Sequence, residues 1–183
     1  MPITDKHALV VNTDFGVEEA ELISPTQALR DAGVDVTVVS STGKRIQTVN
    51  GDKDWASTVE PDSGLDAVRA EDFDIVVVPG GTVNADTLRG DRKFQELLRS
   101  FASAGKPVAE ICHAPWTLID AGLARDKTLT SYSSLRLDLI NAGATWQDTE
   151  LQRCDAAGWV LLTSRNPGDL DAFNTAILEE LGA

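Results

Sequence analysis

Four short runs rich in valine and isoleucine, separated by longer segments with helical spacing, constrain the fold of this chain most strongly. The runs cover residues 7–12, 34–40, 73–81 and 106–111. Apolar runs of this length are typical of strands that are buried on both faces of a sheet. Strands that alternate with helices form βαβ units with right-handed crossovers, which place helices on both faces of a parallel sheet. We therefore predict an α/β fold, a three-layer α/β/α sandwich of the flavodoxin-like type with a mostly parallel sheet.

The segments between these runs carry the signals of helices. Apolar residues recur there at helical spacing, which predicts helices over the ranges 16–33, 91–105, 113–123, 134–143 and 169–181. We expect Pro25 to kink or split the first helix, because proline removes an internal hydrogen bond. Gly33 and Gly122 are expected to end their helices, since glycine readily adopts the left-handed conformation of a helix C-terminus.

Shorter strands are expected in the middle and in the last third of the chain. Residues 127–132 predict one short strand, and residues 149–165 predict two strands around 156–158. The residue pattern over 45–68 does not distinguish clearly between helix, strand and loop. A turn at 48–52 is expected to close a hairpin there.

Composition and charge limit the partners of this chain. Its 183 residues, 42% apolar and 25% charged, are typical of one globular domain, which we expect to span residues 1–183. Sixteen basic residues against 29 acidic ones give a net charge of −13, which disfavours nucleic acid and anionic membrane surfaces as partners. Apolar stretches fall short of the roughly 20 residues that cross a membrane, and residues 1–14 lack the features of a secretory signal.

Cysteine and histidine are too sparse for a disulfide framework or a typical zinc site. The chain holds two cysteines, with no CxxC motif, and two histidines, His7 and His113. We therefore expect a reducing, cytoplasmic location and no bound metal.

Cys112 occupies the most informative position in the sequence, directly after the predicted strand 106–111 and before a predicted helix. Ligands of open parallel sheets bind beyond the carboxyl ends of the strands. A tight turn from strand to helix would project the sulfur outward, as in a nucleophile elbow, and the helix N-terminus would lower the pKa of the thiol. The alternative is a buried structural cysteine, which is how we interpret Cys154.

Two further groups of residues are expected beside the sulfur. Glu18 and Glu21 stand three apart on one helical face, so their like charges would keep one carboxyl protonated as a hydrogen-bond donor. The alternative is that both are solvated acids of a first helical turn. Gly80 and Gly81 allow close backbone approach and, with the N–H of His113, can form an oxyanion hole. The alternative there is an ordinary tight turn.

Several motifs resemble those of a known family. VEEAELISP, FDIVVVPGG, AEICHAPW and TSRNPGDLDAFN are similar, in this order and over nearly the whole chain, to the motifs of the PfpI family. That family includes intracellular cysteine peptidases, protein deglycases and general stress proteins. It lies in the class I glutamine amidotransferase-like superfamily, beside the parkinsonism-associated deglycase.

The resemblance implies roles for particular residues. It implies a flavodoxin-like sandwich, a Cys112–His113 pair, and a protonated Glu21 that hydrogen-bonds the sulfur. It implies a third acid from a neighbouring subunit that orients His113, for which Asp86 stands at about the right place. Here the loop is one residue longer than in the family's peptidases, and the acid is Asp instead of Glu. The alternative for Asp86 is a helix N-cap.

The same resemblance adds other residues and an assembly. Tyr132 matches a tyrosine near the nucleophile, where it can donate a proton or simply pack. Arg165 and Asp169 belong to a signature that we interpret as structural. Because the third acid comes from another subunit, the resemblance implies a homodimer or a larger oligomer.

These residues predict a cofactor-free hydrolase acting on carbonyl substrates. The resemblance favours a protein deglycase or a glyoxalase-type enzyme acting on methylglyoxal adducts, so a small carbonyl compound or a glycated protein would be the substrate. An intracellular cysteine peptidase is the alternative, weakened by Asp86. An alternative of another class is a redox-sensing or chaperone-like stress protein that uses oxidation of Cys112. A glutamine amidotransferase is disfavoured, because its triad needs a later histidine and none follows His113.

Overall fold

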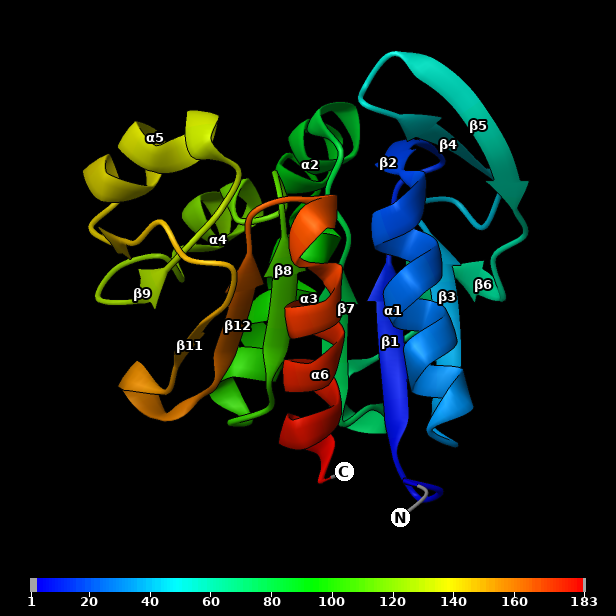
Figure 1. Ribbon diagram of the computed structural model, residues 1–183. Coiled ribbons are helices and arrows are strands. Elements are labelled where there is room, and N and C mark those ends of the chain that lie inside the picture. Colours follow the sequence, from blue (N-terminus) through cyan, green and yellow to red (C-terminus); the bar gives the residue numbers. More distant parts are fainter. Residues whose placement is uncertain (1–2, 183) are drawn as a thin grey trace.

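The computed structural model describes residues 3–182, which are built around a seven-stranded sheet (Figure 1). Its strand order is β11-β12-β8-β7-β1-β3-β6, and every neighbouring pair is parallel except β11 with β12. The strands are β1 (His7–Val11), β3 (Asp35–Ser40), β6 (Ser63–Gly64), β7 (Ile75–Val78), β8 (Val108–Ile111), β11 (Gln152–Cys154) and β12 (Leu161–Ser164).

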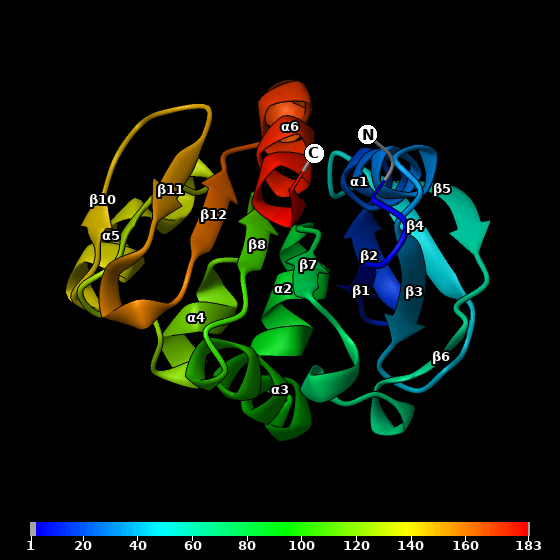
Figure 2. The ribbon, with the colours of Figure 1, turned by 90° about the horizontal axis from the view of Figure 1, so that it is seen from below.

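Helices cover both faces of this sheet (Figure 2). On one face lie α1 (Glu19–Asp31) and α6 (Leu170–Leu181), and on the other lie α3 (Arg92–Ser103) and α4 (Trp116–Ala121). Helix α2 (Thr82–Arg89) follows β7, and α5 (Arg136–Asn141) follows the short 3-10 helix η3 (Ser133–Leu135). The predicted flavodoxin-like α/β/α sandwich is confirmed.

Alternate residues of the buried strands face the two helical layers, which explains their continuous apolar runs. Val76 and Val78 of β7 join the core cluster that contains α3 and α4, whereas Ile75 and Val77 join the cluster that contains α1 and α6. All four side chains are fully buried. The predicted runs therefore became strands because neither face of the sheet is left to water.

A second, three-stranded sheet stands beside the carboxyl ends of the main strands. It is formed by β2 (Phe15–Glu18), β4 (Ile46–Asn50) and β5 (Asp54–Val59). Strand β2 was predicted as the start of a helix; α1 instead begins at Glu19, because residues 15–18 pair with β4. The expected hairpin is present, although its turn lies at residues 51–53, slightly later than predicted.

Two helix predictions differ from the structure. Helix α1 continues through Pro25 without being split. Helix α4 begins at Trp116 and not at residue 113, because residues 112–115 form turns. Their hydrogen bonds span three residues instead of the four of an α-helix; for example, the N–H of Ala114 donates to the carbonyl of Ile111 at 3.1 Å. It ends before Gly122, whose φ of 74° confirms the predicted stop.

The remaining elements are short. Strand β9 (Thr128–Leu129) pairs with β10 (Thr145–Trp146) in a two-stranded sheet, so the predicted strand over 127–132 is shorter than expected. The 3-10 helices are η1 (Leu65–Ala67), η2 (Ala70–Asp72), η3 (Ser133–Leu135), η4 (Ala156–Gly158) and η5 (Pro167–Asp169). Within residues 3–182, no helix has the length and apolar character that crossing a membrane requires.

The core under α3 gives a matched test of this packing. Leu98 in α3 is fully buried, whereas Leu137 in α5 is 61% exposed. We expect Leu98→Ala to lower the free energy of unfolding by about 2–5 kcal/mol, because it removes buried methyl groups and leaves a cavity. Leu137→Ala should change it by no more than about 0.5 kcal/mol. Urea denaturation measures both, and equal effects would contradict this assignment of the core.

Candidate functional site

Cys112 follows β8 directly and has a strained backbone. Its φ of 64° lies in the left-handed region, which residues with a side chain rarely adopt. Its N–H donates to the carbonyl of Ser164 at 3.0 Å, and its carbonyl accepts from the N–H of Tyr132 at 2.8 Å. Hydrogen bonds on both sides therefore hold the turn at the carboxyl edge of the sheet.

The sulfur lines a small pocket at this edge. The pocket has a volume of about 140 Å³ and is lined by Glu18, Glu21, Gly51, Asp52, Gly81, Cys112, His113, Tyr132 and Pro167. We predicted that the turn would project the sulfur outward. Cys112 is only 5% exposed, so its sulfur is not freely accessible to solvent. It reaches the surface through this pocket, because the strand β2, the start of α1 and the hairpin β4–β5 surround it.

Glu21 is a buried carboxylic acid next to the sulfur. The N–H of Gly80 donates to its Oε2 at 2.8 Å. Burial raises its pKa to about 8, against the opposing effects of the Gly80 and Cys112 contacts, so the carboxyl is protonated at neutral pH. Among the residues that the structure describes, its Oε1 has no hydrogen-bond partner. A proton on this carboxyl is therefore available to the sulfur.

The glycine pair makes room for this contact. A Cβ at Gly80 would lie 2.5 Å from Glu21 Oε2 and 2.7 Å from Cys112 Cβ. Gly81 has a φ of 89°, and a Cβ there would lie 2.2 Å from the carbonyl oxygen of Gly16. Since the Gly80 N–H is used by Glu21, the donors that remain beside the sulfur are the N–H groups of Gly81 and His113.

The protein environment disfavours a free thiolate in the resting state. Burial raises the pKa of the Cys112 thiol, and a negative charge on Glu21 raises it further, while the N–H groups of Gly81 and His113 lower it. We predicted a lowered pKa from the following helix, which is wrong because α4 begins only at Trp116 and has six residues. Ionisation of the sulfur therefore needs a base close by.

His113 is placed where its imidazole can accept a proton from the sulfur. Its Nδ1 lies 3.1 Å from the Cys112 sulfur and its Nε2 lies 3.2 Å from the Thr82 hydroxyl. Burial lowers the pKa of its imidazole, with a smaller opposing effect from Asp52, so the ring is neutral at neutral pH. Tyr132 stacks on the ring, with centroids 4.5 Å apart and planes 24° apart. This places Tyr132 as a packing partner of the imidazole.

Asp52 and Thr82 also belong to the site, although the sequence analysis did not single them out. Asp52 sits in the β4–β5 turn and accepts hydrogen bonds from the Thr82 N–H at 2.7 Å and the Thr82 hydroxyl at 2.6 Å. Glu18 accepts a hydrogen bond from the Gly51 N–H at 2.9 Å and so holds the same turn. Burial raises the pKa of Glu18, with a contribution from Asp52.

Asp86 is not brought to the sulfur by this chain. It lies on the exposed surface of α2 and does not line the pocket. The alternative N-cap role does not apply either, because α2 begins at Thr82 and Asp86 stands in its middle. A contact between Asp86 and His113 therefore requires a second copy of the chain. Across residues 3–182, no three or more His, Cys, Asp or Glu side chains are grouped to hold a metal ion.

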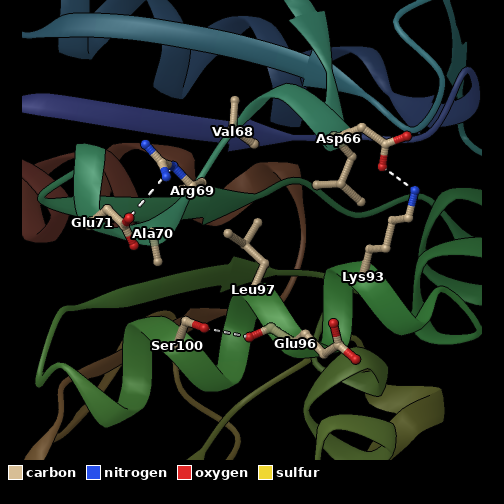
Figure 3. Close-up of a pocket in the computed structure, with 10 residues that line it drawn as sticks. Asp66, Val68, Arg69, Ala70, Glu71, Lys93, Glu96, Leu97 and Ser100 are labelled. Atoms are coloured by element: carbon tan, nitrogen blue, oxygen red, sulfur yellow. Dashed lines mark hydrogen bonds and ion pairs between the residues drawn. The ribbon is translucent and has the colours of Figure 1, made fainter.

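A larger hollow lies elsewhere, between η1, η2 and α3 (Figure 3). Its volume is about 310 Å³, and ion pairs from Lys93 to Asp66 and from Arg69 to Glu71 lie at its rim. It contains no thiol and no imidazole. Of these two hollows, the one at Cys112 therefore contains the thiol and the imidazole.

Comparisons with known proteins find related chains over nearly the full length. The model of the DJ-1/PfpI family matches residues 6–180. Protein/nucleic acid deglycase 2 of Escherichia coli is 40% identical over 99% of this chain and 100% of its own length. The putative cysteine protease YraA of Bacillus subtilis is 38% identical over 98% of this chain and 99% of its own. The crystal structure of DJ-1beta of Drosophila melanogaster has a TM-score of 0.85 and 36% identity, covering 96% of this chain and 90% of that one.

The protonated state of Glu21 can be tested through the reactivity of the sulfur. Above pH 8 the carboxyl ionises, and its charge raises the pKa of the Cys112 thiol. Glu21→Gln keeps a donor but carries no charge. We expect this variant to react faster with iodoacetamide than the wild type at pH 9, by about tenfold for each unit of thiol pKa removed, and to differ little at pH 6. Both proteins should carry Cys154→Ser, and a rate at pH 9 no higher than the wild type contradicts the contact.

Proposed function

Because the chain belongs to the DJ-1/PfpI family, we propose that it is a cysteine-dependent hydrolase of reactive carbonyl adducts, of the deglycase or glyoxalase type. One observation carries the proposal: the neutral imidazole of His113 lies 3.1 Å from the Cys112 sulfur, and the protonated carboxyl of Glu21 is a second neighbour of that sulfur. A buried thiol beside a base and an acid is suited to attack a carbonyl and to exchange protons with them during the reaction. The E. coli relative named a deglycase supports this assignment.

The reaction begins with proton transfer from the thiol to Nδ1 of His113. The thiolate then attacks the aldehyde carbon of an α-oxoaldehyde, and the N–H groups of Gly81 and His113 are placed to stabilise the oxyanion. Transfer of hydrogen from the sulfur-bound carbon to the neighbouring carbonyl carbon gives a thioester. Water then hydrolyses the thioester and releases a hydroxy acid and the thiol. Methylglyoxal plus water thus becomes lactate, with no net oxidation and no need for a cofactor.

The pocket favours small, uncharged or amine-bearing substrates. Its volume of about 140 Å³ suits a compound with few heavy atoms, and Glu18 and Asp52 line it without any lysine or arginine. Carboxylate substrates would be repelled there. A neighbouring hollow of about 270 Å³ shares Tyr132 with this pocket. It offers room for the larger carrier of a glycated side chain, in which the attack on carbon would expel the amine.

Peptidase activity is the second candidate, favoured by the relative from B. subtilis that is named a putative cysteine protease. The same thiol and imidazole can attack an amide carbonyl. The small volume of the sulfur pocket is the argument against it, because an extended peptide must bring both sides of the scissile bond to the sulfur.

The proposed reaction predicts a definite product. We expect the purified protein to convert methylglyoxal into lactate, measured enzymatically or by NMR, and Cys112→Ser to reduce this rate to background because oxygen is a poor nucleophile here. Cys154→Ser serves as the control and should keep the wild-type rate. Absence of lactate together with cleavage of casein would favour the peptidase. Absence of both, with a gain of two oxygens on Cys112 in mild peroxide, would favour a redox role.

We also propose that the protein works as a homodimer or a larger oligomer, since the family resemblance implies an acid from a second copy that orients His113. We expect light scattering during gel filtration to give at least twice the 19.6 kDa mass of the chain. A monomer with full turnover of methylglyoxal would contradict this.

A further inference from the structure

We propose that Asp52, acting through the hydroxyl of Thr82, fixes the tautomer of His113 and stabilises its protonated form. Asp52 and Thr82 would then be positioning residues that complete the site within a single chain. The tautomer does not depend on the proposed function, whereas the effect on turnover rests on it.

The argument starts from the single proton of the Thr82 hydroxyl. A threonine hydroxyl donates one hydrogen bond and accepts others. Its oxygen lies 2.6 Å from Asp52 Oδ2 and 3.2 Å from His113 Nε2. A carboxylate can only accept, so the hydroxyl proton is directed at Asp52. The same oxygen therefore has only lone pairs to offer to His113.

This arrangement leaves one tautomer of the neutral ring that satisfies both contacts. Nε2 must carry the hydrogen, because it faces an oxygen that acts as an acceptor. Nδ1 is then unprotonated, and it is the nitrogen that lies 3.1 Å from the Cys112 sulfur. The opposite tautomer would set two lone pairs against each other at Thr82 and a donor against the thiol proton. The Nε2–H tautomer is thus the form that can accept the proton of Cys112.

Asp52 also matters after the proton has moved. Protonated His113 donates from both nitrogens, so its bond to Thr82 becomes charge-assisted. The negative charge of Asp52 lies one hydroxyl beyond and raises the pKa of the imidazole, opposing the effect of burial. A single chain therefore supplies a hydrogen-bonded series that runs from the Cys112 thiol through the His113 imidazole and the Thr82 hydroxyl to the Asp52 carboxylate.

The placement of Asp52 is held by contacts outside the turn itself. Gly51 and Asp52 both have positive φ, of 60° and 62°, as the two central residues of a tight hairpin turn require. The Thr82 N–H and the Glu18 carboxylate fix the turn from the side of the site. These contacts bring Asp52 into line with Thr82 and His113, although the chain separates Asp52 from Thr82 by 30 positions.

Other titratable groups approach His113 from the elements packed around it. Glu21 comes from α1 and Glu18 from the end of β2, and both line the pocket. Tyr132 stacks on the ring, and Arg89 lies over Trp116, which in turn packs against the imidazole. Among these described groups, the hydrogen-bonded connection of Nε2 to a carboxylate runs through Thr82 to Asp52.

The family resemblance implies instead that Asp86 of a second copy orients His113. The two candidates, Asp52 and Asp86, can be distinguished because each predicts that different variants lose activity. Asp52→Asn keeps the size and an acceptor but removes the charge. Thr82→Val removes the hydroxyl at constant shape, and Thr82→Ser retains it. Asp54→Asn is a matched control, because Asp54 is exposed in the same hairpin. Asp86→Asn tests the competing assignment.

The first measurement is NMR of the two histidine rings labelled with ¹⁵N, at neutral pH and without substrate. The ring of His113 should show the Nε2–H tautomer in the wild type and in Thr82→Ser, and should lose this preference in Thr82→Val. A titration should show the pKa of His113 lower in Asp52→Asn by about one unit. An Nδ1–H tautomer in the wild type, or an unchanged pKa in Asp52→Asn, overturns the proposal.

The second measurement is turnover of methylglyoxal by the same variants. We expect Asp52→Asn and Thr82→Val to lose about tenfold in kcat, by analogy with the loss that removing an outer hydrogen-bond partner of a metal-bound histidine causes, with KM little changed. Asp54→Asn should keep the wild-type rate. A loss confined to Asp86→Asn overturns the proposal in favour of the acid from a second copy. If the wild type makes no lactate, the proposed function fails, while the NMR result still decides the role of Asp52.

Discussion

The left-handed backbone of Cys112 is the constraint from which the rest of the site follows. Such a conformation costs a residue with a side chain about 1–2 kcal/mol, and here hydrogen bonds to Ser164 and from Tyr132 hold both of its peptide groups. Because of this turn, the side chain of Cys112 lies at the edge of the sheet, where its sulfur contacts Glu21 and His113. Gly80 must then lack a side chain, since a Cβ would collide with Glu21 and Cys112. The strain at one residue is therefore held by the sheet beneath it.

Burial favours the uncharged forms of the Cys112 sulfur and of its two neighbours, Glu21 and His113. It raises the pKa values of Cys112 and Glu21 and lowers that of His113. A resting thiol, carboxylic acid and imidazole avoid the cost of buried charge. Ionisation then requires a proton to move within the group, because solvent cannot easily stabilise a single charge there. We therefore expect Cys112, His113 and Glu21 to titrate as one coupled group and not as separate residues.

The sequence predicts the framework better than the electrostatics. The apolar runs gave the buried strands, and Cys112 at the end of one run identified the turn, because both signals are local in sequence. The start of α4 and the strand β2 were missed, since they depend on turns at 112–115 and on pairing with β4. Asp52 and Thr82 meet across 30 positions through a hairpin turn, and no periodicity reports such a contact. The raised pKa of Cys112 was missed because it follows from burial.

The site thus combines residues from two parts of the fold that are held in place by different contacts. The elbow of Cys112 rests on the central sheet, whereas Asp52 rests on a hairpin outside that sheet. The hairpin is attached by carboxylates, with Glu18 accepting from the Gly51 N–H and Glu19 from the Ser57 N–H. A change in these contacts would move the Asp52 charge without disturbing the strand that carries the sulfur. If Asp52 orients His113, the orienting acid is supplied by the same chain, and this part of the site does not depend on a second copy.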